Sequence, residues 1–405
     1  MKKKMLLVST LAILTMILLA ACAGSEPSVT QVAIDETPDV TSAELAEATT
    51  DPTPEDLAES TPEDSIEQES RFMEIRYATG FSVEYIADDV RIVTDSDNRR
   101  ILLVPRGQSV PSGFEEYIVI ETPVQNALFG ATTMIGAIRP FDIWESVGGV
   151  IALPEMSGAM DRDFEESGYD IVYFGSTMAP DFELIQLVNP DIAFVNTGDF
   201  PQSDLITMLD ELDIPYVVHN GFMEPTHQGR LEYMQLIATF FDIDEEAAAF
   251  VEEEFAKLAE LETIVAGVTD RPLVGMGLIH GGVVHVSGAD SYVANQVRDA
   301  GGDWIFSHLG PDSTQLSMEE FFAVMADADL WIYPSRMLLH YYDALIALDP
   351  IVAEIPVVAN RQVWEFHEDY WYLVDQLAQQ VIDLAIIFHP DLFPGYEPFH
   401  YVPLN

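Results

Sequence analysis

The sequence predicts an α/β fold with two lobes, each built on a mostly parallel sheet, joined by a single long helix. Short apolar strands alternate with helical stretches from about residue 115 to 222, and the same alternation starts again after Asp270. Between these two regions, residues 245–265 read as one uninterrupted helix. Its apolar residues recur at helical spacing, at Ala248, Val251, Phe255, Leu258, Leu261 and Val265. A helix of about 20 residues spans roughly 30 Å, which is enough to connect two lobes.

Residues 1–22 have the pattern of a lipoprotein signal peptide. Lys2, Lys3 and Lys4 precede an apolar stretch, which ends in the lipobox sequence Leu19-Ala20-Ala21-Cys22. The apolar stretch is shorter than the roughly 20 residues that a membrane-spanning helix needs. We therefore expect lipidation at Cys22 and an extracytoplasmic, lipid-anchored protein. An ordinary cleaved signal peptide is the alternative.

Residues 23–70 predict a disordered acidic tether. The segment is rich in Thr, Pro and Ala and has 14 acidic residues and no Lys or Arg. Residues 71–405 have 55 acidic and 14 basic residues, which argues against binding nucleic acid or anionic membranes through their surface. A surface adapted to a saline exterior explains this charge, and attraction of cationic or metal-bearing ligands is the alternative. Cys22 is the only cysteine, so a hydrophobic core must hold the fold.

The remaining chain divides into three parts. Residues 71–222 are expected to form the N-terminal lobe, 223–266 the linker helices and 267–405 the C-terminal lobe. The first lobe starts with an antiparallel β meander within residues 72–104, where apolar and polar residues alternate between turn signals. In both lobes the expected strands are residues 118–120, 135–138, 171–174, 192–195, 216–218, 273–278, 283–286, 330–333 and 355–359. The expected helices are residues 123–131, 181–187, 202–212, 230–241, 245–265, 292–300, 318–325 and 370–387.

Four segments resemble the class III periplasmic binding proteins, the family that binds ferric siderophores, haem and cobalamin. Residues 182–195, FELIQLVNPDIAFV, are similar to the family's LE-x-I-x-x-L-x-P-D-L-V helix and strand. Residues 286–288 and 295–306 resemble its SG and A-G-G-x-N-I-F segments, with Trp304 where asparagine is common. Residues 316–320, LSMEE, resemble the family's segment vs-x-E-x-l, which opens a helix and contains a glutamate. Residues 223–230 are close to an E-x-H-P-x-G-R segment but lack its His-Pro pair.

The resemblance implies a class III solute-binding fold with two Rossmann-like lobes and the role of substrate-binding component in an ABC importer. Such a protein captures an iron chelate, with a ferric siderophore expected first and haem or cobalamin next, and delivers it to the permease dimer and its ATPase. It implies a monomer without a cofactor of its own. It also implies that Glu183 and Glu319, one in each lobe, pair with arginines of the two permease subunits. A carboxylate in the first turn of a helix is also stabilised by the helix dipole, which is a purely structural explanation.

The ligand is expected to contact loops that follow the strands, where an open α/β sheet forms its binding crevice. Arginine suits carboxylate or catecholate oxygens, aromatic rings suit flat chelates, and His or Tyr suits an axial metal position. The candidate ligand-binding residues are Thr122, Arg139, Phe141, Phe174, Ser176, Asn196, His280, His285, Tyr333, Arg336, Arg361 and Trp364.

The sequence contains no pattern that predicts a catalytic or a metal site. The histidines show no HxxxH or HxH pairing, and the glycine pairs lack the spacing of nucleotide-binding loops. No GxSxG motif is present. We therefore expect no catalytic residues, no protein-only metal site and no enzyme. A secreted two-lobed hydrolase or chelatase, or a ligand-sensing lipoprotein without a transporter, remain the alternatives.

Overall fold

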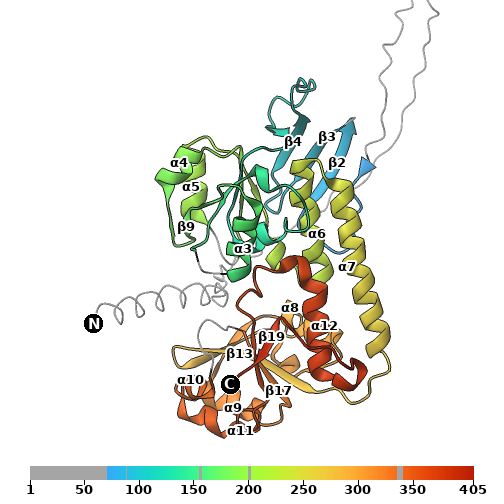
Figure 1. Cartoon of the computed structure of the whole chain (residues 1–405), viewed down its shortest axis with the longest axis vertical. Helices are drawn as coiled ribbons and strands as arrows, with labels where there is room; N and C mark the ends of the chain where they lie inside the picture. Colours follow the sequence, from blue (N-terminus) through green and yellow to red (C-terminus); the bar gives the residue numbers. More distant parts are fainter. Residues whose placement is uncertain (1–70, 88, 155–156, 199–201, 335–340) are drawn as a thin grey trace, which may run out of the picture. The chain divides into compact units, whose positions relative to one another are not determined.

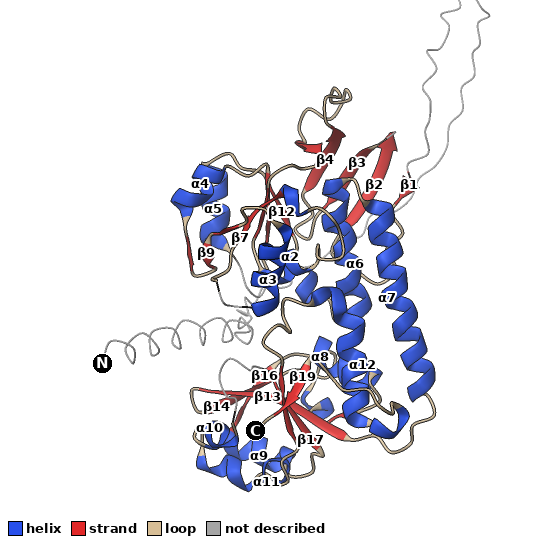
Figure 2. Ribbon diagram, in the orientation of Figure 1, coloured by secondary structure: helices blue, strands red, loops and turns tan. Residues whose placement is uncertain are grey.

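The structure is a computed structural model that describes residues 71–405 except 88, 155–156, 199–201 and 335–340 (Figure 1). The signal peptide 1–22 with Cys22, the tether 23–70 and Arg336 lie outside the described residues. In the part of the chain that is described, no helix is long and apolar enough to cross a membrane. Figure 2 shows strands and helices alternating in two regions, connected by long helices.

A five-stranded sheet leads the described chain. Its strands lie in the order of the sequence, as β1 (Arg71–Phe72), β2 (Ser82–Ala87), β3 (Val90–Thr94), β4 (Arg100–Pro105) and β5 (Ile118–Thr122). The first four are antiparallel, and β5 runs parallel to β4. Val83 and Val93 face the main core, whereas Ile92 and Leu102 on the opposite face form a second cluster with Tyr117. Both faces of this sheet are therefore packed, because consecutive apolar residues such as Ile101 and Leu102 of β4 point to opposite faces.

The N-terminal lobe contains a parallel sheet of order β12-β11-β6-β7-β8. These strands are β6 (Ala127–Phe129), β7 (Val147–Val150), β8 (Val172–Tyr173), β11 (Ile192–Val195) and β12 (Tyr216–Val218). The helices are α2 (Thr132–Gly136), α3 (Gly158–Ser167), α4 (Phe182–Val188) and α5 (Ser203–Glu211), and β9 (Gly175–Ser176) forms a small hairpin with β10 (Ala179–Pro180). A short 3-10 turn, η2 (Trp144–Ser146), precedes β7.

Two predictions for this lobe were wrong, because the expected helix 123–131 contains strand β6 and the expected strand 135–138 overlaps helix α2. The expected strand 118–120 is confirmed as part of β5, which joins the leading sheet and not the parallel sheet. Strand β7, which contains the pair Gly148-Gly149, was not predicted. A side chain on Gly149 would place Cβ 2.3 Å from the carbonyl oxygen of Val172, so glycine allows β7 and β8 to approach closely.

The linker consists of η3 (Gly221–Met223), α6 (His227–Ala238), η4 (Thr239–Phe241) and α7 (Asp244–Val265). Helix α6 is buried along nearly its whole length. Helix α7 buries one stripe, which includes Val251, Leu258 and Leu261, and helix α12 (Leu377–Phe388) packs against it. The 22 residues of α7 form the single long helix that the sequence predicted.

The C-terminal lobe contains a seven-stranded sheet of order β16-β14-β13-β17-β18-β19, with β15 beside β13. Its strands are β13 (Leu273–His280), β14 (Val283–Val286), β15 (Asp303–Trp304), β16 (Thr314–Ser317), β17 (Leu330–Tyr333), β18 (Val363–Phe366) and β19 (Tyr401–Pro403). Strands β15, β13, β17 and β18 are parallel, and the other three pair antiparallel. The helices are α8 (Tyr292–Asp299), α9 (Met318–Met325), α10 (Tyr342–Ile346), α11 (Pro356–Ala359) and α12, and the 3-10 turns are η5 (Ser307–Leu309), η6 (Pro350–Glu354), η7 (Val374–Gln376) and η8 (Pro390–Leu392). The predicted two-lobed α/β fold with a long linker helix is confirmed.

The C-terminal lobe also corrects two predictions. The expected strand 355–359 is helix α11, with Pro356 at its first position, where proline has no hydrogen bond to lose. The strand of this region is β18, which was not predicted. The expected helix 370–387 begins only at Leu377 as α12, after the 3-10 turn η7.

Candidate ligand site

The two lobes touch where the loop after β18 meets the start of α3. Asp369, only 2% exposed, accepts hydrogen bonds from the Ser157 hydroxyl at 2.8 Å and from the Ala159 amide at 3.0 Å. Arg162 places Nη2 3.9 Å from an Asp369 oxygen, and its side chain remains 63% exposed. Ser157 follows β7 and Asp369 follows β18, so loops at the carboxyl ends of parallel strands from both lobes lie together. Ligands of open α/β sheets bind at such ends.

Arg139 forms a second contact between the lobes. Its Nε donates to Asp163 of α3 at 2.7 Å, and its Nη1 donates to both oxygens of Asp375 at 2.7 Å. The Tyr372 hydroxyl donates to the same Asp163 oxygen at 2.7 Å. Burial acts to lower the pKa of Arg139, but the charge of Asp375 and hydrogen bonds to both carboxylates raise it above its usual range. Arg139 is therefore a permanently charged link between the lobes.

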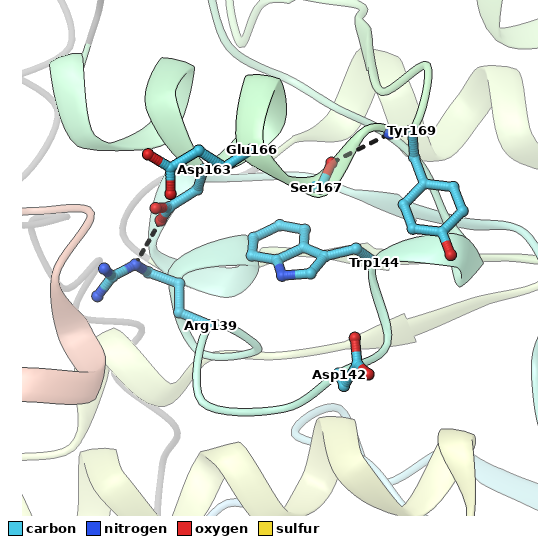
Figure 3. A pocket seen from close by; sticks show the side chains of 7 residues that line it. All are labelled: Arg139, Asp142, Trp144, Asp163, Glu166, Ser167 and Tyr169. Atoms are coloured by element: carbon cyan, nitrogen blue, oxygen red, sulfur yellow. Dashed lines mark hydrogen bonds and ion pairs between the residues drawn. The ribbon is translucent and has the colours of Figure 1, made fainter.

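A hollow of about 310 Å³ lies beside this link. Figure 3 shows the side chains that line it, which are Arg139, Asp142, Trp144, Asp163, Glu166, Ser167 and Tyr169. Trp144 precedes β7 and Tyr169 precedes β8, so the hollow lies near the amino ends of these strands. It is thus at the opposite edge of the sheet from the loops that contain Ser157 and Asn196, and Arg139 is the only predicted ligand residue in its lining.

Three predicted ligand residues of the N-terminal lobe are buried in its core. Thr122 and Phe174 have no exposed surface, and Phe141 is 8% exposed. The Thr122 hydroxyl accepts a hydrogen bond from Arg91 at 3.1 Å. These three side chains are therefore packed inside the lobe.

Two further predicted ligand residues, Asn196 and Ser176, belong to the same lobe, and Asn196 is buried, at 9% exposed. Asn196 directly follows β11, and its side-chain oxygen has no hydrogen-bond partner within the described residues. Ser176 is partly exposed in β9. Asn196 therefore lies at the strand end where the sequence placed it.

His280 and His285 lie together on the β13–β14 hairpin. The antiparallel register pairs His280 with Val283 and Leu278 with His285, so both imidazoles project from the same face. His285 is 6% exposed, and neither of its ring nitrogens has a hydrogen-bond partner among the described residues. Burial and then the nearby His280 lower the pKa of His285, which favours a neutral imidazole. Tyr333, at the end of β17, is 1% exposed, and burial raises its pKa above the usual range.

Arg361 and Trp364 do not lie in the loop where the sequence placed them. Because the strand is β18 and not residues 355–359, Arg361 precedes it and Trp364 is within it. The Arg361 guanidinium lies 4.9 Å from the ring centre of Tyr342. The segment that follows the strand is residues 367–373, which the sequence interpretation missed.

Aromatic side chains and one histidine lie in the segments after β18 and before β19. The His367 ring lies 4.5 Å from the ring of Phe399, at an interplanar angle of 30°. Trp371 is 45% exposed and Phe399 49% exposed. The aromatic-rich residues 363–372, VWEFHEDYWY, were the available signal, because aromatic residues are enriched in strands and in ligand-binding loops.

Glu183 and Glu319 are both exposed in the first turns of α4 and α9. Neither side chain caps its helix. Asp181 accepts from the Leu184 amide at 3.0 Å at the start of α4, and Ser317 and Glu320 form a capping box at the start of α9. Both carboxylates are therefore available to a partner.

Among the residues that the structure describes, no three His, Cys, Asp or Glu side chains are grouped so that they could hold a metal ion.

One family model, a sequence relative and several solved structures are similar to this chain. The sequence profile of the family described as periplasmic binding protein matches residues 144–370. An uncharacterized lipoprotein of Methanocaldococcus jannaschii is 26% identical over 331 residues, which cover 78% of each chain. A periplasmic haem-binding protein from Pseudomonas aeruginosa superposes with a TM-score of 0.57 at 14% identity, covering 70% of this chain and 98% of that protein. A molybdate periplasmic binding protein, MolA of Haemophilus influenzae, gives 0.56 at 18% identity, covering 75% and 92%. The chain therefore belongs to the periplasmic binding protein family, whose members bind solutes and are not enzymes, as the resemblance in the sequence implied.

Proposed function

We propose that this chain is the substrate-binding component of an ABC importer, anchored by a lipid on Cys22 outside the cytoplasmic membrane. Its membership of the periplasmic binding protein family supports this role. The lipobox supports the anchor, as does the similarity to a protein described as a lipoprotein. We also propose that residues 23–70 are the tether and that the lobes divide at residues 222 and 267.

The single observation that carries the proposed ligand site is the meeting of the loops after β7 and β18 at Ser157 and Asp369. At this place Arg162 is cationic and largely exposed, and Trp371 and Phe399 offer exposed aromatic surface. A cation beside aromatic rings suits a ligand that is flat or apolar and has anionic oxygens. A chelate with catecholate or carboxylate groups has these properties.

The proposed cargo is an iron chelate, with a ferric siderophore first and haem or cobalamin next. The similar structures are described as binding haem in one case and molybdate in another, and both ligands contain a metal. His280 and His285 are proposed to face this cargo, since a neutral imidazole is a good metal ligand. Asn196 and Ser176 are proposed as polar contacts from the other lobe.

Glu183 and Glu319 are proposed to dock on the two permease subunits. They occupy matching positions in the two lobes, are exposed and do not serve as helix caps. Charged pairs at the rim of an interface steer and orient association. The expected partners are therefore a permease dimer with basic residues at the matching positions, and its ATPase.

Trp371→Ala tests the ligand site. The variant should lose at least about tenfold in affinity for the cognate chelate, which corresponds to about 1.4 kcal/mol. Tyr169→Ala is the matched control, since Tyr169 is 47% exposed against 45% for Trp371 but lies at the amino edge of the first sheet. Equal affinities of both variants and the unmodified chain would place the ligand elsewhere.

A further inference from the structure

Five successive backbone amides between β1 and β2 donate hydrogen bonds to two carboxylates of the linker. We call residues 76–80 the strap. The amides of Arg76, Tyr77 and Ala78 donate to Glu232 of α6 at 2.8, 2.8 and 2.6 Å. The amides of Thr79 and Gly80 donate to Glu224, which precedes α6, at 2.7 and 3.3 Å.

Both carboxylates are inside the protein. Glu232 is 1% exposed and Glu224 is 4% exposed. Among the ion pairs of the described residues, neither carboxylate is a member, although Arg230 interacts electrostatically with Glu224. The hydrogen bonds from the strap amides therefore compensate part of the cost of burying the two carboxylates. A buried carboxylate without such donors is costly, because it has lost its hydration. The strap and the linker are therefore held together by more than apolar contact.

Side chains of the strap also pack on the linker. The Arg76 guanidinium pairs with Glu252 and lies 4.8 Å from the ring centre of Phe255, both on α7. The Tyr77 ring packs on Phe255 at 5.3 Å. At Gly80 an added Cβ would lie 2.1 Å from the Tyr233 hydroxyl, so the strap touches α6 as closely as a backbone can.

Residues 224–230 of the linker also contact helix α8 of the C-terminal lobe. His227 Nε2 lies 2.6 Å from Asp299 of α8, and the Asn295 side chain donates to the Pro225 carbonyl at 2.7 Å. The Arg230 guanidinium lies 3.4 Å from the ring centre of Tyr292. Residues 224–230 thus contact the strap on one side and α8 on the other.

We infer that the strap, through Glu224 and Glu232, fixes the angle between the two lobes. While the strap is hydrogen-bonded to Glu224 and Glu232, residues 224–230 are held rigidly between the strap and α8. The leading sheet, which is continuous with the strap, then stiffens the linker. The lobes then hold a preset separation, and a ligand binds without a large closing movement. This inference rests on the contacts of residues 224–230 with the strap and with α8, and it does not depend on the identity of the ligand.

The double variant Glu224→Gln, Glu232→Gln tests this inference. Each substitution keeps the size of the side chain but replaces one acceptor oxygen by an amide that cannot accept from the strap. Spin labels on Gln186→Cys and Ala323→Cys, both exposed and one in each lobe, report the distance between the lobes. Cys22→Ser in the full chain removes the only native cysteine, so that only these two positions are labelled.

We expect the distance distribution between the labels to broaden, and hydrogen exchange of amides 76–80 to accelerate by about tenfold or more. The control is Glu253→Gln, an exposed glutamate on α7, which should change neither. If the double variant does not fold, Gly80→Ala gives the same test, because its Cβ would displace the strap from Tyr233. Faster exchange of amides 76–80 would show that the strap has been released. If the distance distribution between the labels nevertheless stayed as narrow as in the unmodified chain, the inference would be overturned.

Discussion

The Ser157 hydroxyl donates a hydrogen bond to Asp369 at 2.8 Å, and this bond joins the first helix after β7 to the loop after β18. Asp369 also accepts from the Ala159 amide at 3.0 Å, so two donors of one lobe hold one buried carboxylate of the other. The contact defines which loops of the two lobes meet at the proposed ligand site.

Ser157→Ala should destabilise the protein, because it removes a donor from a buried carboxylate. The expected loss is about 1–3 kcal/mol in the free energy of unfolding. Urea titration of the folded chain measures it. Ser167→Ala is the control, since the Ser167 hydroxyl donates to Phe164 within its own helix, and it should change stability by less than about 0.5 kcal/mol. Equal losses in both variants would contradict the role of the Ser157–Asp369 bond.

The ionisation of Asp383 should make the free energy of unfolding depend on pH in the acid range. Burial acts to raise its pKa, but hydrogen bonds from the His400 ring and backbone lower it below its usual value. A carboxyl group with a lower pKa in the folded state stabilises the protein above its unfolded pKa, and this contribution is lost as pH falls through the folded pKa. Asp383→Asn should therefore reduce the fall in stability between neutral pH and about pH 3, which lies below the usual pKa of an aspartate. Chemical unfolding at a series of pH values measures this dependence. If the free energy of unfolding of Asp383→Asn fell as steeply toward acid pH as that of the unmodified chain, another group would cause the loss of stability.

Cys22→Ala should release the protein from membranes without unfolding it. The tether is expected to separate the anchor from the folded lobes, so the loss of the lipid should leave the thermal melt unchanged. Membrane fractionation with a high-salt wash measures the release. A variant that stays with the membrane would contradict the lipobox interpretation.

Glu183→Ala combined with Glu319→Ala should leave ligand affinity unchanged and abolish most transport. Docking should weaken at least about tenfold, which requires only about 1.4 kcal/mol. Stability should change by less than about 1 kcal/mol for each site, because only a helix-dipole contact is lost. Ligand titration, thermal melting and transport in reconstituted vesicles are measured on the same variant. Transport that survives, or ligand binding that fails with it, would reject this pair as the docking groups.

Local signals predicted much of the fold. Helix α4 and strand β11 correspond to the expected helix 181–187 and strand 192–195, and in the structure Asp181 is the N-cap of α4 and Asn189 its C-cap. Helix α7 was found from its apolar stripe. The apolar run 355–359 was misread as a strand, because short apolar runs do not distinguish a strand from a buried helix.

The site was predicted less well than the fold. Once β18 was missed, Arg361 and Trp364 were assigned to a loop that they do not occupy, and His367 and Trp371 were overlooked. The strap was not found either, since Arg76 and Glu232 are 156 positions apart and no local pattern links a backbone amide to a distant carboxylate. Such contacts follow from tertiary packing alone.

The most direct test of the central claim is a titration of tryptophan fluorescence in the chain lacking its signal peptide. Ferric hydroxamates, ferric catecholates, haem and cobalamin are added separately, and Trp371→Ala is titrated in parallel. We expect saturable binding of one chelate per chain for at least one of these ligands, and weaker binding of the same ligand by Trp371→Ala. No saturable response to any of the four would contradict the assignment of a metal chelate as the cargo.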